Sequence, residues 1–249
     1  MARRGKSGRV LVLDVGGTHV KMRIGTRGPI REFKSGRKLG AKQMVARVLK
    51  MTADWDYEVI SIGFPGVVVH GKIAAEPHNL GTGWIGFDFG KAFSRPVRII
   101  NDAALQAVGS YRGGRMLFLG LGTGLGVTLI LDGVVEPMEI GHMPYKHGRS
   151  YEDYVGERGY RRLGTKKWRK VVAQVIEQLS TVLEADYVVL GGGNVRKLKT
   201  LPKKVHRGDK RNACPIYRGS NEHAFVGGVR LWEQSAQNML VLRGHRRRG

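Results

Sequence analysis

The chain has 249 residues, enough for one large domain or two smaller lobes around a substantial core. Its single cysteine excludes a disulfide framework and any zinc site built from several cysteines. The net charge of +23 at pH 7 predicts attraction to polyanions, such as nucleic acid or phosphate polymers, although a general basic bias would give the same total. The sequence contains no run of 18 apolar residues and no apolar signal segment, so we expect a cytoplasmic protein.

The first hundred residues have the pattern of an α/β lobe. Alternating or apolar runs predict strands at residues 9–15, 18–24, 30–34, 58–64 and 97–100. Apolar residues at helical spacing predict a helix over residues 41–53, and residues 86–93 fit a shorter one. A hairpin is expected at residues 67–75, followed by a loop.

The rest of the chain continues the α/β pattern. We predict strands at residues 116–120, 127–131 and 187–190, and helices at 103–111, 151–163, 168–183 and 222–233. Asp132 and Gly133 are a strong hairpin signal. Residues 196–211 are interpreted as a basic loop or short helix, and residues 243–249 as a frayed tail.

Two segments share one order of strand, Gly/Thr turn and strand: "LDVGGTHVKMRIG" and "LGLGTGLGVTLIL". This weak internal repeat predicts two similar α/β lobes with a cleft between them, which is a common place for a ligand. We place the small N-terminal lobe at residues 9–100 and the larger C-terminal lobe at 101–249. A final helix near residues 222–234 is expected to pack back on the first lobe.

The two Gly/Thr turns are candidate phosphate sites. Glycines let backbone amides approach an anion, and a threonine hydroxyl adds a donor. Neither turn has the pattern of a Walker loop or a dinucleotide fingerprint, and a tight hairpin without function is the alternative. Asp14, at the end of the first strand, could hold Mg²⁺ through water, or it could only accept hydrogen bonds from the amides of its own turn.

Polar residues in the middle of the chain are candidates for chemistry at a hydroxyl group. Asn101 can cap the helix that follows it, so Asp102 could act as a general base, although a second cap is the alternative. Glu139, His142 and Glu152 do not have the spacing of a zinc site and suit hydrogen bonds to sugar hydroxyls, unless they only line a surface loop.

Taken in order, the motifs resemble those of the ROK family of sugar kinases, within the actin/hexokinase-like superfamily. The resemblance covers about residues 10–232 and implies a two-lobed, ribonuclease H-like α/β fold with a central cleft. It rests on the segments "LDVGGTHVK", "GFPGVV", "HNLGTGWIGFDF", "NDAALQAVGSY", "LGLGTGLGVTLILDG", "EIGHM" and "VVLGGGNV".

The resemblance implies a role for each motif. Asp102 would be the base that takes a proton from the 6-hydroxyl of the sugar. Sugar contacts would come from Gly66, Asn79, Asn101, Glu139, His142 and Glu152. Contacts to the donor phosphates would come from Asp14 (through Mg²⁺), Gly16, Gly17, Thr18, Lys21, Gly122, Thr123 and Gly124, with Gly191, Gly192 and Gly193 beside a nucleotide.

The segment after "EIGHM" departs from the family pattern. Many relatives have a cysteine-rich zinc loop there, whereas this chain has "MPYKHGRSYEDYVG", so we expect no zinc. The shorter alignment leaves Glu157 as an alternative to Glu152. The zinc-free form with "GWIGFDF" resembles most the polyphosphate glucokinase branch, which implies glucose as acceptor, polyphosphate or ATP as donor, and a homodimer.

Sugar-responsive repressors of the same family offer an alternative function. They carry an N-terminal helix-turn-helix, and the short basic stretch before the first strand leaves no room for one here. A regulator or nucleic-acid-associated relative without catalysis is therefore the second hypothesis. The basic ends suit non-specific contact with phosphate backbones, but we do not expect specific nucleic-acid binding.

Overall fold

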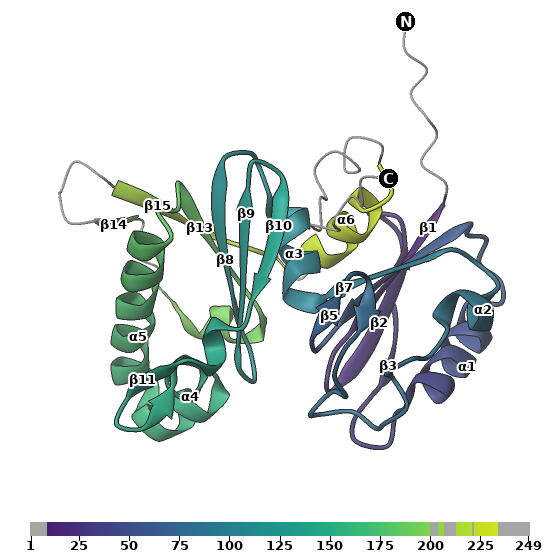
Figure 1. The fold of residues 1–249 in the computed structure, drawn as a ribbon, viewed down its shortest axis with the longest axis horizontal. Coiled ribbons are helices and arrows are strands. Elements are labelled where there is room, and N and C mark those ends of the chain that lie inside the picture. The colour runs from purple at the N-terminus through teal and green to yellow at the C-terminus, as the bar shows by residue number, and fades with distance from the viewer. Residues whose placement is uncertain (1–8, 200–203, 207–212, 221, 234–249) are drawn as a thin grey trace, which may run out of the picture. The chain divides into compact units, whose positions relative to one another are not determined.

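The computed structural model describes residues 9–199, 204–206, 213–220 and 222–233. The chain divides into two compact units (Figure 1): unit 1 comprises Met1–Gly109 and Glu222–Gly249, and unit 2 comprises Ser110–Asn221. The sequence analysis placed the boundary at residues 100 and 101. In the structure the chain leaves unit 1 after Gly109, because most of helix α3 (Asp102–Ser110) belongs to that unit.

Unit 1 is built on a five-stranded mixed sheet. Strands β1, β4 and β7 are parallel, while β2 is antiparallel to β1 and β3 to β2. In spatial order the strands are β3 (Arg31–Lys34), β2 (His19–Ile24), β1 (Val10–Val15), β4 (Val59–Phe64) and β7 (Val97–Asn101). A two-stranded hairpin, β5 (Val68–Val69) with β6 (Lys72–Ile73), follows β4.

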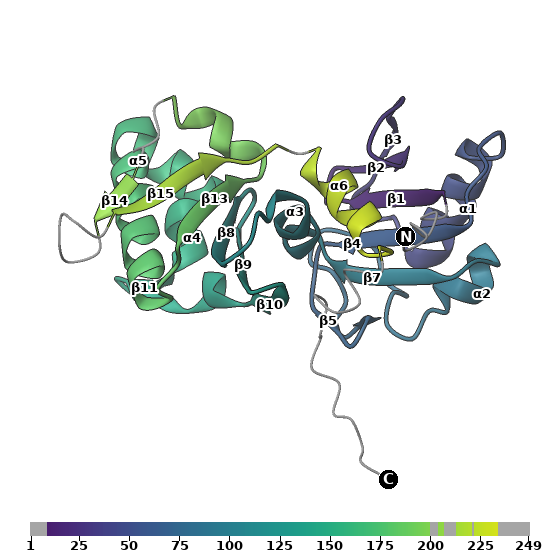
Figure 2. The same ribbon diagram turned by 90° about the horizontal axis from the view of Figure 1, so that it is seen from above.

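Helices cover both faces of this sheet. Side chains alternate along β1, so Leu11 and Leu13 enter the core that contains Met44 of α1 (Ala41–Met51) and residues of α2 (Phe89–Phe93). Val12 points to the opposite face, against Gly228 of α6 (His223–Arg230). Figure 2 shows α6 beside β1 and β4, so the last described helix packs on unit 1.

Unit 2 repeats the arrangement of unit 1. Strands β8, β13 and β15 are parallel, while β9 is antiparallel to β8 and β10 to β9. In spatial order the strands are β10 (Val134–Met138), β9 (Leu125–Leu131), β8 (Arg115–Leu121), β13 (Tyr187–Gly191), β15 (Ala213–Arg218) and β14 (Lys204–His206). The internal repeat predicted from the two Gly/Thr segments is confirmed by this shared strand order.

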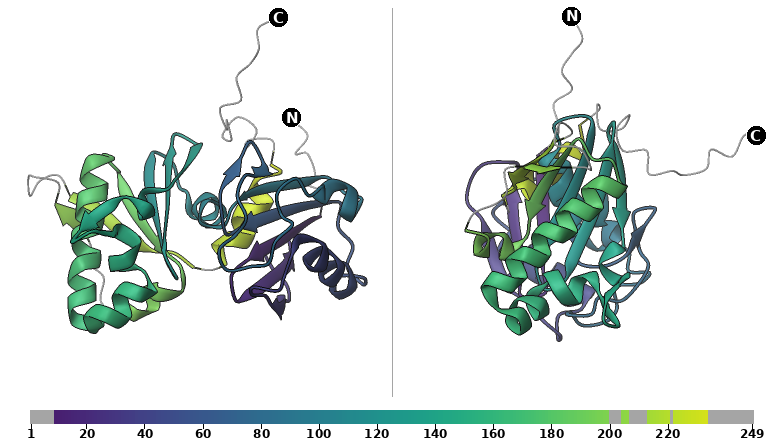
Figure 3. Two further views of the ribbon diagram at one scale, coloured as in Figure 1. Left: turned by 60° about the horizontal axis from the view of Figure 1, so that its bottom comes forward. Right: turned by 90° about the vertical axis from the view of Figure 1, so that its left-hand side faces the viewer.

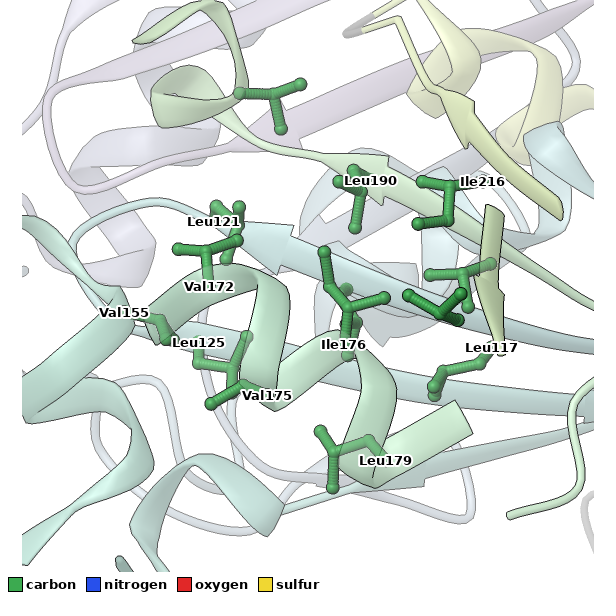
Figure 4. Close-up of a cluster of buried hydrophobic side chains, with 14 of the residues drawn as sticks. Leu117, Leu121, Leu125, Val155, Val172, Val175, Ile176, Leu179, Leu190 and Ile216 are labelled. Carbon is green, nitrogen blue, oxygen red and sulfur yellow. The ribbon is translucent and has the colours of Figure 1, made fainter. Parts of the chain in front are cut away.

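The long helix α5 (Glu157–Val182) closes the core of unit 2 (Figure 3). Val172, Val175, Ile176 and Leu179 lie among leucines of β8, β9 and β13 (Figure 4). Four shorter elements precede α5 and one follows β13. They are η1 (Ile140–His142), β11 (Pro144–Lys146), β12 (Arg149–Ser150), α4 (Tyr151–Val155) and η2 (Gly193–Lys197).

Several local predictions differ from the structure. The helix predicted from residue 151 to 163 ends at Val155, and α5 begins at Glu157. Gly164 lies inside α5 with φ of 68°, where the two predicted helices were separated. Strand β14 falls within the segment predicted to be a basic loop or short helix. Strand β15 falls where no element was predicted, because Pro215 weakens the strand pattern. Residues 200–203, 207–212 and the predicted tail at 243–249 lie outside the described residues.

Candidate active site

The first Gly/Thr turn links β1 to β2 and contacts a distant loop of unit 1. The Gly16 amide donates to the His19 carbonyl at 2.9 Å, and the Ser35 hydroxyl donates to the Gly16 carbonyl at 2.6 Å. A Cβ on Gly17 would lie 3.1 Å from the Cβ of Asn79. The predicted phosphate turn and the predicted sugar segment are therefore in close contact, and a side chain at Gly17 would require Asn79 to shift by a few tenths of an ångström. Thr18, at the tip of the turn, is exposed.

Asp14 lies on the face of the sheet that carries α3. It is paired with Gly63 of the neighbouring parallel strand β4, so the two positions share a face. A Cβ on Gly63 would lie 3.4 Å from the Cα of Asp102 and 2.7 Å from the Leu105 side chain. Asp14 and Asp102 therefore lie at the same carboxyl edge of β1, β4 and β7, which is where open α/β sheets bind ligands.

Burial raises the pKa of the Asp14 carboxyl to about 6, and the charge of Lys21 on β2 opposes this rise. Lys21 is the cross-strand partner of Asp14. Among the described residues no group donates a hydrogen bond to Asp14, so the alternative in which it only accepts from its own turn is not supported. A carboxylate without such donors is suited to a cation.

The start of α3 is fixed by Asn101, as the sequence predicts. The Asn101 side-chain oxygen accepts from the amides of Ala103 at 2.9 Å and Ala104 at 3.2 Å. Its amide nitrogen donates to the Gly66 carbonyl at 3.1 Å, which ties the "GFPG" segment to the helix. One oxygen of Asp102 accepts from the Ala103 amide at 2.8 Å. Gly66, Asn101 and Asp102 thus form one local cluster.

The second Gly/Thr turn, Gly122 to Gly124, links β8 to β9 in unit 2. The Gly122 carbonyl accepts from the Asn194 side chain at 2.7 Å and from the Glu157 amide at 3.0 Å. Gly192 has φ of 83°, and a Cβ there would lie 2.4 Å from the Leu121 carbonyl. The structure therefore brings the predicted nucleotide-side glycines, Gly191, Gly192 and Gly193, next to the second turn.

The three polar residues after β10 form a chain of contacts in unit 2. Glu139 Oε2 lies 3.3 Å from His142 Nδ1, and His142 Nε2 lies 3.8 Å from Glu152 Oε2. A Cβ on Gly124 would lie 2.2 Å from the same Glu152 oxygen, so the cluster adjoins Thr123 and its turn. Gly141 is required in η1, because a Cβ there would lie 2.5 Å from the Leu125 carbonyl.

Glu157 has different partners from Glu152. Lys197 Nζ lies 2.6 Å from Glu157 Oε2, Arg161 Nε lies 3.1 Å from Oε1, and the Lys197 hydrogen bond lowers the pKa of Glu157. Glu152, and not Glu157, lies with His142. No group of three or more histidine, cysteine, aspartate or glutamate side chains in the described segments could hold a metal ion.

The predicted residues divide between the units. Unit 1 contains Asp14, Gly16, Gly17, Thr18, Lys21, Gly66, Asn79, Asn101 and Asp102, and unit 2 contains Gly122, Thr123, Gly124, Glu139, His142, Glu152, Gly191, Gly192 and Gly193. Sequence reasoning missed Ser35, Asn194 and the contact of Arg158 with Glu152. Only Asn194 carried a local signal, as a polar residue directly after a glycine run.

The sequence matches no protein-family model and no curated protein. Its structure is similar to the inorganic polyphosphate/ATP-glucomannokinase of Arthrobacter sp. strain KM, with a TM-score of 0.74, 23% identity, and coverage of 89% of this chain and 96% of that one. It is also similar to a ROK-family glucokinase from Streptomyces griseus, in complex with glucose and AMPPNP. The TM-score is 0.72 and the identity 16%, with coverage of 91% of this chain and 100% of that one. A third similar structure is a ROK-family transcriptional regulator, a homolog of the E. coli MLC protein. Its TM-score is 0.68 and its identity 15%, with coverage of 95% of this chain and 81% of that one.

These likenesses extend over nearly all of the chain and of the two kinases. Sequence identity below 25% supports a shared fold, whereas the reaction has to be argued from the residues of the site. The predicted resemblance is therefore confirmed in its architecture, and this chain has the α/β fold of ROK-family sugar kinases.

Proposed function

We propose that the chain is a ROK-family sugar kinase that transfers a phosphoryl group from polyphosphate or ATP to the 6-hydroxyl of glucose. The observation that carries the proposal lies in unit 1, where Asp14 and Asp102 share one edge and one face of the parallel strands. The contact of Gly17 with Asn79 adds support, because it brings the proposed phosphate turn next to the proposed sugar segment. The fold of the similar kinases is consistent with this reaction.

In this proposal Asp102 is the general base. It accepts the proton of the sugar's 6-hydroxyl as that oxygen bonds to phosphorus and the bond from phosphorus to the donor oxygen breaks. Glu139, His142 and Glu152 hold sugar hydroxyls together with Asn79, Asn101 and the Gly66 backbone. The chemistry then needs mainly positioning and charge neutralisation, which amide-lined turns supply.

Donor phosphates are assigned to the two Gly/Thr turns, with Lys21 beside the first and Gly191 to Gly193 beside the second. Asp14 fits Mg²⁺, which proteins commonly bind through one or two carboxylates together with substrate phosphates. When bound, Mg²⁺ would neutralise donor charge. No zinc is proposed.

A polyphosphate chain is proposed to follow residues 158–170 and the described part of 196–211. The Glu157 amide at the start of α5 donates to the Gly122 carbonyl, so this basic helix begins beside the proposed second phosphate turn. Lys166, Lys167 and Lys170 are exposed along it. A cytoplasmic homodimer is proposed from the resemblance alone. No helix in the described part of the chain has the length and apolar character to cross a bilayer.

A non-catalytic, sugar-responsive regulator is the second candidate, favoured by the likeness to the ROK-family regulator. A matrix of glucose, mannose, fructose and N-acetylglucosamine against ATP and long-chain polyphosphate separates the two functions. Phosphorylation of glucose by polyphosphate without nucleotide is expected. Turnover with ATP alone would remove polyphosphate as donor, and DNA binding without phosphotransfer to any sugar would favour the regulator.

Asp102→Ala tests the base directly. Loss of a general base costs on the order of 10²–10⁴ in turnover, so kcat should fall by that factor. Glucose affinity, measured by calorimetry without donor, should change much less. A variant that keeps most of its turnover would assign the base to another residue.

A further inference from the structure

We propose that Arg158 is a positioning residue for the sugar-side cluster, because it holds Glu152 and, through Glu152, orients His142. The inference rests on the proposed function, which assigns Glu152 and His142 to the sugar. It concerns a side chain that the sequence identifies only as one of several cations at the start of α5. Its position among carboxylates separates it from the others.

The guanidinium of Arg158 lies between two carboxylates of α4. Its Nη2 is 3.2 Å from Glu152 Oε1, and its Nη1 is 3.4 Å from Asp153 Oδ1. The planar fork of an arginine can serve two acceptors at once, which an ammonium group does less well. The remaining oxygen of Glu152, Oε2, lies 3.8 Å from His142 Nε2. Each oxygen of Glu152 therefore has its own partner.

Glu152 is confined from a third side. The space that a Cβ of Gly124 would occupy is taken by Glu152 Oε2. The Glu152 side chain is 21% exposed, whereas His142 and Glu139 are each 59% exposed. Glu152 is thus the anchored member of the cluster, and the more exposed imidazole lies between it and Glu139.

The backbone of α4 is held without Arg158. Ser150 and Asp153 form a reciprocal cap at the start of α4, and the Arg162 side chain donates to the Asp153 carbonyl at 2.8 Å. Tyr145 packs against Tyr151 and Tyr154, with ring centres 4.6 and 5.1 Å away. Loss of Arg158 should therefore release the Glu152 side chain and leave the fold of this segment in place.

A released Glu152 should weaken sugar binding more than turnover. Contacts to sugar hydroxyls away from the reacting oxygen are made equally in the ground state and the transition state, so losing them raises KM and leaves kcat nearly constant. Arg161 offers a matched control on the same helix. It is similarly exposed and pairs with Glu157, 3.1 Å away, without touching Glu152.

The experiment compares the glucose KM of Arg158→Gln with that of Arg161→Gln at saturating donor. Both positions lie on the proposed polyphosphate path, and a saturating donor keeps any effect on donor binding out of the comparison. The glucose KM of Arg158→Gln should rise about 2- to 5-fold, the range of an exposed ion pair, with little change in kcat. The glucose KM of Arg161→Gln should stay at the wild-type value, and Arg158→Lys should recover part of the loss. Thermal midpoints of all variants should remain close to the wild-type midpoint.

Three kinetic outcomes would overturn the proposal: an unchanged glucose KM in Arg158→Gln, an equal rise in both glutamine variants, or a change confined to the donor KM. Failure of the proposed function would look different, since the wild-type chain would then phosphorylate no hexose. NMR tests the positioning in that case too. The ring resonances of His142 should shift in Arg158→Gln and not in Arg161→Gln, and unmoved resonances in both would also overturn it.

Discussion

Burial of Asp14 raises its pKa to about 6, which makes the ionised residue a cost to the fold. The folded chain keeps the proton up to about pH 6, whereas the unfolded chain releases it near 3.8. The stabilising contribution of the bound proton is therefore present below pH 3.8 and is lost as the pH rises to about 6. Above that pH the ionised group costs about 1–3 kcal/mol of unfolding free energy.

Asp14→Asn should therefore stabilise the protein near neutral pH and inactivate it. We expect a gain of about 1–3 kcal/mol at pH 7.5, because the uncharged amide removes the buried charge. The gain should shrink toward zero near pH 4, where Asp14 is already protonated in the folded chain. Urea unfolding of both proteins at the two pH values, with kinase assays alongside, measures this.

Asp54 provides a control of opposite sign. Its hydrogen bond with Arg31 lowers its pKa to about 2, so its ionised form favours the folded state. Asp54→Asn should lose stability at neutral pH where Asp14→Asn gains it. Equal effects of the two substitutions would contradict the assignment of Asp14 as a destabilising charge.

Helices α3 and α6 meet through glycines, and this contact completes one face of unit 1. A Cβ on Gly109 would lie 1.9 Å from the His223 carbonyl and 2.8 Å from the Gly227 amide. A Cβ on Gly227 would lie 1.9 Å from the Leu105 carbonyl. Since α6 follows the whole of unit 2 in the chain, this contact ties the last described helix back to the first unit.

Gly109→Ala should destabilise unit 1 by at least about 3 kcal/mol, the upper range for overpacking, because backbone atoms cannot move aside as a flexible side chain can. Gly90→Ala in α2 is the matched control. The added methyl there would meet nothing closer than Asp88 Oδ1 at 3.5 Å, so the substitution should be neutral or slightly stabilising. Similar thermal midpoints for the two variants would argue against a close helix contact.

The charge of the whole molecule bears on the choice of donor. With a net charge of +23, the chain attracts a long polyanion through many weak contacts, each of which releases counterions. A nucleotide makes only a few such contacts. If polyphosphate is the donor, as proposed, its binding should gain more from this charge than the binding of ATP does, most strongly at low ionic strength.

We expect the KM for long-chain polyphosphate to rise much more steeply with KCl than the KM for ATP. Screening at 0.15 M salt acts over about 8 Å, so contacts spread along a surface are lost first. Initial rates at four or five KCl concentrations, with glucose saturating, measure both slopes. Equal dependence of the two KM values on KCl would mean that the positive charge does not contribute to donor binding. If short polyphosphates show the weaker salt dependence of ATP, the result would support an extended contact with the long chain.

Many of the elements could be predicted from the sequence, because alternation and helical spacing record which side chains are buried. The strands around Asp14, the cap at Asn101 and the repeat of the two Gly/Thr turns were all visible in local order. Where the buried side chains of a segment follow a simple period, its secondary structure can be predicted without knowing what packs against it.

Only the tertiary structure decided the features that depend on residues far apart in the chain. At the break between α4 and α5, Gly156 packs so closely on the second turn that a Cβ there would lie 2.6 Å from the Thr123 carbonyl. Strand β15 forms around Pro215 because β13 and β14 flank it. The raised pKa of Asp14, and the partners that separate Glu152 from Glu157, likewise come from packing. Local sequence patterns indicate which side chains of a segment are buried, but they do not indicate which atoms from distant parts of the chain contact them.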